Sequence, residues 1–242
     1  MKNYIYGKNM LANALSHNDS IKHLVMTSSF HDDRISKLIK ERNIRYRIVS
    51  QAEITRLVGN VNHQGIVAEV EEYEYKTLDE IIEKNKDNEN ALIVLLDGIE
   101  DPHNVGAILR SCDAFGVNGL VIGANRQVGL NSTVAKVSTG AIEYVDCAMV
   151  TNLNQAIQKL KDNGYWVVST DGEAKNDYRD LDYKMKTVLV VGSEGFGISK
   201  LVLKNSDFTV KIPMVGHVNS LNASVAAAIL ISEIFSKRNP NK

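Results

Sequence analysis

Residues 92–115 of the chain read LIVLLDGIEDPHNVGAILRSCDAF, in which two apolar stretches flank a polar turn. The first stretch, residues 92–96, contains no polar residue, which is typical of a strand buried on both faces of a parallel sheet. The second stretch, residues 105–115, has the length of a short, largely buried helix. A buried strand that leads through a polar loop into a helix is the unit from which α/β folds are built.

The same alternation continues to the end of the chain and predicts an α/β fold with a parallel sheet covered by helices on both faces. Further strands are expected at residues 120–122, 165–169, 187–191 and 208–212, with further helices at 133–137, 153–162, 198–203 and 224–235. Ligands of such folds bind beyond the carboxyl ends of the strands. The loops that follow the strands are therefore the expected place for a site.

Residues 1–72 predict a small separate α/β domain. Helices are expected there at residues 7–16, 32–41 and 51–58, and strands at 24–26, 46–49 and 65–70. Residues 73–90 differ in composition, and their tail, residues 83–90, contains no apolar side chain, which predicts a solvated linker with at most a short helix before it. The main domain is then expected over residues 91–242.

The composition is that of an ordinary globular protein, with 242 residues, 44% of them hydrophobic, and a formal net charge of -1. This charge is not that of a strongly basic nucleic-acid binder, so any RNA contact must come from local patches or from two copies of the chain. No apolar run approaches the roughly 20 residues that span a bilayer, and the first residues lack the apolar core of a signal peptide. We therefore expect a cytoplasmic protein without membrane contact.

The cysteines and histidines give no metal signal. Cys112 and Cys147 lie in apolar sequence and are expected to be reduced core thiols, not a disulfide or a metal pair. The six histidines do not pair at metal-ligand spacing. No metal site is expected.

The loop after the first strand of the main domain, residues 101–106, reads DPHNVG. Asn104 stands where a helix N-cap is expected. Arg110 follows among apolar residues, which suggests that it lies on the buried side of its helix and needs an anionic partner such as phosphate or carboxylate. Taken alone, the loop is explained as well by a simple cap and a surface cation.

Residues 192–197, GSEGFG, form the second polar loop. Their glycine spacing is G-x-x-G-x-G, which is not the dinucleotide fingerprint, and no Gly-Lys-Ser/Thr follows, which excludes a P-loop. Glycines let a backbone approach a ligand closely. A turn with Glu194 as a capping residue is an equally good explanation of this loop taken by itself.

The third polar loop follows the strand expected at residues 208–212, which Pro213 ends. Ser220, Asn222 and Ser224 then occur at every second position before an alanine-rich helix. One of the three is expected to cap that helix, and capping leaves the other two unexplained.

Together the three loops resemble, in order and content, the motifs of the SpoU family of RNA 2′-O-ribose methyltransferases. The resemblance covers essentially all of residues 89–242, including the middle stretch 131–145. Residues 62–68, NHQGIVA, are similar to the end of the RNA substrate-binding domain that precedes the catalytic domain in the bacterial large-subunit rRNA guanosine methyltransferase subgroup. Short transfer-RNA methyltransferases of the family lack this front domain.

The resemblance implies several properties at once. It implies S-adenosylmethionine as the methyl donor, a deep trefoil knot near the C-terminus, and a homodimer whose active site draws on both subunits. The implied substrate is a guanosine ribose in large-subunit (23S) rRNA. The implied catalytic residues are Asn104, Arg110, Glu194, Ser220 and Asn222, and the implied cofactor contacts are Thr170, Gly192, Gly195, Ile212, Met214, Leu221 and Ser224.

Within that resemblance, Arg110 holds the RNA phosphate beside the target ribose. Because a guanidinium is effectively always protonated, we expect Arg110 to orient and polarise the ribose hydroxyl and not to accept its proton. Ser220 and Asn222 would position the ribose or Arg110. Glu194 would order the loops and pair with a cation, for which Arg110 is the candidate.

Three alternatives remain at this point. The substrate could be a transfer RNA or another rRNA site. The chain could be a non-catalytic RNA-binding factor of ribosome assembly on a degenerate methyltransferase fold, or an unrelated α/β nucleotide-binding enzyme. The intact set of polar residues in the three loops favours the catalytic reading.

Overall fold

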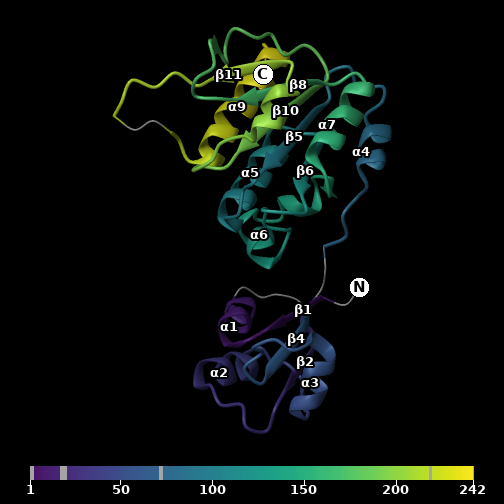
Figure 1. The fold of residues 1–242 in the computed structure, drawn as a ribbon, viewed down its shortest axis with the longest axis vertical. Coiled ribbons are helices and arrows are strands. Elements are labelled where there is room, and N and C mark those ends of the chain that lie inside the picture. Colours follow the sequence, from purple (N-terminus) through teal and green to yellow (C-terminus); the bar gives the residue numbers. More distant parts are fainter. Residues whose placement is uncertain (1–2, 17–20, 71–72, 218–219, 242) are drawn as a thin grey trace. The chain divides into compact units, whose positions relative to one another are not determined.

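The computed structural model describes residues 3–16, 21–70, 73–217 and 220–241 and divides into two compact units (Figure 1). The front unit comprises residues 1–74 with 131–133, and the main unit comprises residues 75–130 with 134–242. No helix in the described ranges is long and apolar enough to cross a membrane.

The front unit contains a four-stranded sheet in the order β1-β4-β2-β3. Its strands are β1 (Asn3–Tyr6), β2 (Ile21–Met26), β3 (Tyr46–Ile48) and β4 (Ile66–Val70), and its helices are α1 (Lys8–Ser16), α2 (Asp33–Glu41) and α3 (Gln51–Val58). Strand β4 runs antiparallel to β1 and β2, whereas β3 runs parallel to β2. Strand β1 was not expected from the sequence.

Period-2 alternation in β4 divides the front core into two layers. Ile66 and Ala68 belong to one buried cluster with residues of α1 and α2, whereas Val67 packs with Ile54 of α3 in a second cluster. Successive side chains of a strand point to opposite faces, so one short strand serves both layers.

The main unit contains a seven-stranded, all-parallel sheet in the order β7-β6-β5-β10-β8-β11-β9. The strands are β5 (Leu92–Asp97), β6 (Gly119–Gly123), β7 (Cys147–Val150), β8 (Trp166–Thr170), β9 (Asn176–Asp177), β10 (Thr187–Gly192) and β11 (Phe208–Lys211). The predicted α/β class with a parallel sheet is confirmed. The edge strands β7 and β9 were not expected from the sequence.

Helices cover both faces of this sheet. They are α4 (Leu78–Lys84), α5 (Pro102–Ala114), α6 (Ser132–Val137), α7 (Leu153–Asp162), α8 (Lys200–Lys204) and α9 (Ala223–Arg238), with a short 3-10 turn η1 (Ala141–Glu143). Side chains of α4, α7 and α8 pack with Ile93 and Leu95 in one buried cluster. The alternate residues Val94 and Leu96 are also buried and face the opposite side. Helices α5 and α9 pack against each other, and α9 also contacts β10 (Figure 1).

Helix α4 lies inside the stretch predicted to be a linker. Thr77 and Glu80 form a reciprocal capping box at its start, and Leu78, Ile81 and Ile82 are buried in the core of the main unit. Beyond the helix, Asn85 is also buried and donates to the Ile81 carbonyl at 2.8 Å. Residues 73–90 are thus not solvated throughout, because a capped apolar turn of helix docks on the sheet.

Both cysteines are free and buried, as expected. Burial raises the pKa of the Cys112 thiol well above its ordinary value. A thiol in this setting is chemically inert.

Candidate active site

The carboxyl ends of β5 and β10 lie side by side and carry two of the three polar loops. Gly192 pairs with Asp97 in the parallel register of these strands. The Asp97 carboxylate accepts a hydrogen bond from Ser199 N at 2.8 Å, which fastens the end of the β10 loop to the end of β5. Asp97 was not singled out in the sequence, although a carboxylate directly after a buried apolar strand was the available signal.

The loop after β10 folds back on itself. Ser193 and Gly197 exchange backbone hydrogen bonds at 3.2 and 2.9 Å. A Cβ on Gly192 would lie 2.3 Å from the Gly197 carbonyl carbon, so only glycine fits there. Gly195 has nothing within 4 Å of such a Cβ. The close approach at Gly192 is therefore to the chain's own backbone, whereas Gly195 is open.

The expected N-cap at Asn104 is wrong. Helix α5 begins at Pro102, and Asp101 caps it by accepting from His103 N at 2.8 Å. Proline lacks an N–H and has a helix-compatible φ, so it is well suited to the first helical position. Asn104 is consequently the third residue of the helix, and only 8% of it is exposed.

Glu194 gathers the three loops into one hydrogen-bond network. Its Oε1 accepts from Asn104 Nδ2 at 3.1 Å and from Asn222 Nδ2 at 2.5 Å. The same oxygen accepts from the backbone N–H of Ala223 at 3.2 Å. Asn222 Nδ2 also donates to Asn104 Oδ1 at 2.9 Å. A single carboxylate oxygen can accept several hydrogen bonds, so one oxygen of Glu194 links side chains and backbone of α5 and α9.

Asn222 is the residue that caps helix α9. Its Oδ1 accepts from the backbone N–H groups of Ser224 and Val225 at 2.9 and 3.3 Å, and from Ser224 Oγ at 2.6 Å. The cap explains Asn222 and Ser224 together. Ser220 is exposed and makes no hydrogen bond with another described residue.

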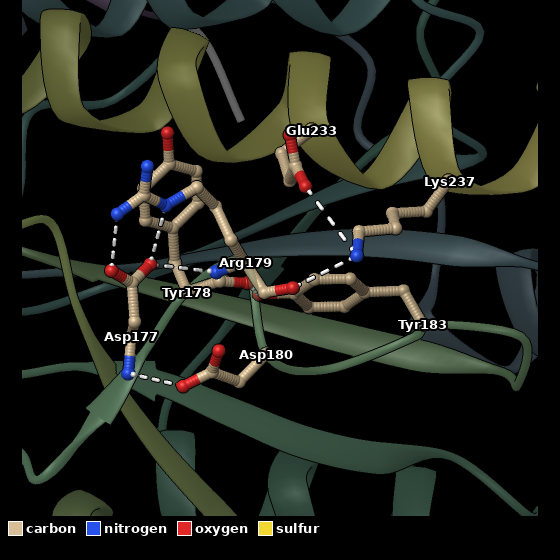
Figure 2. Close-up of polar contacts among 7 residues, drawn as sticks. All are labelled: Asp177, Tyr178, Arg179, Asp180, Tyr183, Glu233 and Lys237. Atoms are coloured by element: carbon tan, nitrogen blue, oxygen red, sulfur yellow. Dashed lines mark hydrogen bonds and ion pairs between the residues drawn. The ribbon is translucent and has the colours of Figure 1, made fainter.

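The two ends of α9 are both fixed, which holds Asn222 in place. At the C-terminal end Lys237 Nζ donates to the Arg179 carbonyl at 2.8 Å and lies 3.9 Å from Glu233 (Figure 2). Arg238 donates to the carbonyls of Asn90, Tyr183 and Met185 and to the hydroxyl of Thr187. Burial lowers the pKa of the Arg238 guanidinium to about 10.

The loop that Lys237 binds is itself held by an ion pair. Arg179 Nε and Nη2 donate to the two carboxylate oxygens of Asp177 at 2.9 and 2.6 Å (Figure 2). The Arg179 guanidinium holds the pKa of the Asp177 carboxyl down at about 2. Tyr183, which is fully buried, donates to the Tyr178 carbonyl at 2.7 Å. This cluster is structural and anchors α9.

Arg110 does not lie where the sequence suggested. It is exposed and makes no hydrogen bond or ion pair with another described residue. Glu194 bonds to Asn104 and Asn222 instead, so the expected ion pair between Arg110 and Glu194 is not formed. It lies six residues beyond Asn104, which at about 3.6 residues per turn is roughly a third of a turn off the Asn104 face. Its neighbours Ile108 and Leu109 are buried, but Arg110 falls on the solvent-facing strip of α5.

The predicted cofactor contacts lie in three loops at or near this edge. Thr170 ends β8, and its hydroxyl donates to the Val190 carbonyl at 3.4 Å. Ile212 and Leu221 are half-buried, whereas Met214 is 39% exposed. Phe196 and Val215, which the sequence analysis did not assign, are almost fully exposed beside these positions in the chain.

The exposed loops fit a ligand that combines a cation with apolar and hydrogen-bonding parts. The peptide groups of Pro213, Met214 and Val215 make no hydrogen bond to any other described residue, so their carbonyl oxygens remain available. Carbonyl dipoles suit a sulfonium cation, and the exposed apolar side chains suit a methionine chain or a purine. In the described residues, no group of three or more His, Cys, Asp or Glu side chains could hold a metal ion.

A parallel α/β sheet with three polar loops gathered at its carboxyl edge is the arrangement of a ligand-binding α/β protein. Residues 91–232 match the model of the SpoU rRNA Methylase family, and residues 4–76 match that of the RNA 2'-O ribose methyltransferase substrate binding domain. A TrmH family tRNA/rRNA methyltransferase of Staphylococcus aureus (strain COL) is 44% identical over 237 residues, covering 97% of this chain and 96% of that protein.

Two solved structures are similar to this chain in fold, and both are of methyltransferases that bind AdoMet. The AdoMet-bound rRNA methyltransferase from Sinorhizobium meliloti matches with a TM-score of 0.61 and 26% identity, over 96% of this chain and 85% of that one. AviRb, a SpoU methyltransferase from Streptomyces viridochromogenes in complex with AdoMet, matches with a TM-score of 0.65 and 24% identity, over 99% and 92% of the two chains.

The chain belongs to the SpoU family. It is an S-adenosylmethionine-dependent RNA methyltransferase with an N-terminal substrate-binding domain.

Proposed function

We propose that this protein methylates the 2′-hydroxyl of a guanosine ribose in large-subunit (23S) rRNA, and that it acts as a cytoplasmic homodimer. The observation that carries the proposal is the hydrogen-bond network of Glu194 with Asn104 and Asn222. Asn104 lies 90 positions from Glu194 and 118 positions from Asn222 in the sequence, yet it bonds to both. The front unit, which matches a substrate-binding domain for RNA ribose methylation, favours rRNA over a small substrate.

In this proposal each polar residue has one task. S-adenosylmethionine supplies an electrophilic methyl group, and the loops at residues 192–198 and 212–215 hold it with Thr170, Leu221 and Ser224. Glu194, Asn104 and Asn222 fix those loops relative to α5 and α9. Ser220 contacts the target nucleotide. None of these tasks requires a metal ion.

Arg110 binds the RNA phosphate beside the target ribose. Its guanidinium is exposed and unpaired among the described residues, so it is available for an anion, and its planar fork matches phosphate oxygens. A fixed positive charge beside the ribose lowers the pKa of the 2′-hydroxyl, but the guanidinium does not take the proton. The acceptor of that proton is a further group or water.

The position of Arg110 also supports a homodimer. Within its own chain it lies off the face of α5 that carries Asn104, and it has no bond to the Glu194 network. In a dimer, the Arg110 of one copy would complete the site formed by the loops of the other. The deep trefoil knot that the family resemblance implies for residues near the C-terminus remains part of the same proposal.

Methyl transfer from labelled S-adenosylmethionine to unmodified RNA tests the proposal. We expect label in 23S rRNA, resistant to alkaline hydrolysis at one guanosine, because a 2′-O-methyl group blocks cleavage of the adjacent phosphodiester. Equal amounts of unmodified transfer RNA should remain unlabelled. Label in transfer RNA alone would overturn the rRNA assignment and favour the second candidate, which the tRNA/rRNA description of the S. aureus relative keeps open.

A further inference from the structure

The front unit has a polar pocket at one edge of its sheet. The pocket has a volume of ≈ 260 Å³ and is lined by Thr27, Ser29, Phe30, Gln51 and residues 61–65. These segments follow β2 and β3 or precede the antiparallel β4, so they meet at the same end of the sheet. The volume is below the roughly 300–1,000 Å³ of sites for drug-sized ligands, which restricts the occupant to a single small group.

A tight turn builds the floor of this pocket. Gln64 has φ 52° and Gly65 has φ 78°, so two consecutive residues are in the left-handed region. A Cβ on Gly65 would lie 2.6 Å from Thr27 Oγ1, so only glycine fits. Glutamine in the left-handed region is unfavourable, and such residues cluster at ligand sites because the surrounding structure must hold them there.

Two side chains of this turn are oriented as donors. His63 is 4% exposed, and its Nδ1 accepts from Gly65 N at 3.1 Å, so the neutral ring carries its proton on Nε2. Gln64 Oε1 accepts from Lys8 N at 2.8 Å, which leaves the amide NH₂ group to donate. Neither Gln64 Nε2 nor His63 Nε2 has a partner among the described residues.

The other residues that line the pocket are uncharged. Thr27 and Ser29 contribute hydroxyls that lie 3.2 Å apart, and the exposed surface of the lining is almost wholly polar, with Phe30 packed against the core of the front unit. Among the described residues, the lining contains no Lys or Arg, and the Nζ of Lys8, outside it, is already bonded to the His31 carbonyl and to Asp32. A lining of uncharged hydrogen-bond donors suits the polar edge of a nucleobase better than a charged phosphate.

We infer that this pocket binds one unpaired nucleobase of the RNA substrate, through a base edge that carries hydrogen-bond acceptors. Uracil, with its O4 acceptor, and guanine, with O6 and N7, present such edges, whereas cytosine presents an N4 amino donor at the position of O4. Unpaired bases of single-stranded loops are the usual targets of sequence-specific RNA recognition, by stacking and by edge contacts. The inference rests on the proposed RNA function and assigns part of its specificity to Gln64 and His63.

A pair of homopolymers tests the pocket with the full chain. Oligouridine and oligocytidine of equal length carry the same backbone charge, so their difference in affinity isolates the base edge. We expect oligouridine to bind about three- to tenfold more tightly, which corresponds to about one net hydrogen bond. Gln64→Gly removes the amide while suiting the positive φ, so it should lower oligouridine affinity by that factor and abolish the difference.

Asn43→Gly is the matched control. Asn43 is another left-handed residue of the front unit, with φ 51°, but it does not line the pocket. This variant should bind both oligomers as the wild type does, and both variants should keep the wild-type affinity for S-adenosylmethionine. Equal wild-type affinities for the two oligomers, or an unchanged difference in Gln64→Gly, would overturn the inference. Methyl transfer is read separately, so wild type that binds oligouridine selectively yet methylates no RNA would contradict the proposed function alone.

Discussion

Helix α5 presents two opposite situations within two turns. At its start, Asn104 is 8% exposed and both ends of its amide are bonded, to Glu194 and to Asn222. Further along, Arg110 is exposed and has no partner among the described residues. A residue whose bonds are all made within the protein builds the site, whereas a charged residue left free is available to a substrate. Asn104 and Arg110 thus differ in role: Asn104 helps to build the site, whereas Arg110 is available to contact the substrate. Each prediction below tests one of these two roles.

The largest effect is expected from Arg110→Ala. Removing a charge that acts on the reacting ribose should lower methyl transfer by about 100-fold or more, the loss typical of one electrostatic catalytic group. Because Arg110 is exposed and has no partner among the residues that the structure describes, the free energy of unfolding should change by no more than about 0.5 kcal/mol. Affinity for S-adenosylmethionine, measured by calorimetry, should be retained. Full methyl transfer by the Arg110→Ala protein would show that Arg110 does not act on the reacting ribose.

Glu194→Ala should disrupt the hydrogen-bond network that orders the loops of the site, and should lower methyl transfer. The variant leaves Asn104, Asn222 and the Ala223 N–H without their shared acceptor. Because Glu194 is exposed, each lost bond costs less than the about 1.5–3 kcal/mol of a shielded bond to a charged group. We expect methyl transfer to fall about 10- to 100-fold and cofactor affinity to fall with it. Glu173→Ala removes an exposed carboxylate elsewhere in the main unit and is the control. Unchanged cofactor affinity in Glu194→Ala would show that the network does not order the loops.

Two glycines of the same loop give a matched pair for stability. Gly192→Ala forces a Cβ to within 2.3 Å of the Gly197 backbone and should destabilise the protein by about 1–3 kcal/mol, as overpacking does. Gly195→Ala meets nothing within 4 Å and should leave stability within about 0.5 kcal/mol of wild type. Denaturant unfolding of the two variants measures the difference. Equal stability of the pair would contradict the folded-back loop.

The smallest effect concerns a paired arginine, for contrast with Arg110. The pKa of Asp177 is lowered from 3.8 to about 2, chiefly by its bond to the Arg179 side chain. The stabilisation from this pair is therefore present above about pH 4 and is lost as the pH falls through about 2. Arg179→Gln should return the Asp177 pKa toward 3.8, as followed by NMR titration of the carboxyl carbon. Titration near 3.8 in the wild type would show that the ion pair does not persist in solution.

The sequence predicted most of the main sheet because β5 and β10 are continuous apolar runs that only a doubly covered strand explains. It missed β1, β7 and β9, which are two to four residues long and exist because neighbouring strands pair with them. Helix α4 was largely hidden in a charged stretch, since only three of its residues face the core.

The site residues were predicted by type more successfully than by position. The apolar neighbours of Arg110 suggested that it was buried. Neighbours in the sequence do not show which side of a helix a residue faces, because that depends on where the helix begins. Helix α5 begins at Pro102 and is capped by Asp101. Asn104 and Asn222 looked like two separate caps. That they bond to each other and to Glu194 depends on the packing of α5 against α9, which no local pattern encodes.

Site-by-site mapping of ribose methylation in 23S rRNA tests the central claim most directly. RNA would be compared from wild-type cells, from cells lacking this protein, and from such cells complemented with wild type or with Arg110→Ala. We predict that one guanosine 2′-O-methyl group disappears from 23S rRNA, returns with wild type and does not return with Arg110→Ala. An unchanged 23S map, with the loss confined to transfer RNA or found nowhere, would contradict the account.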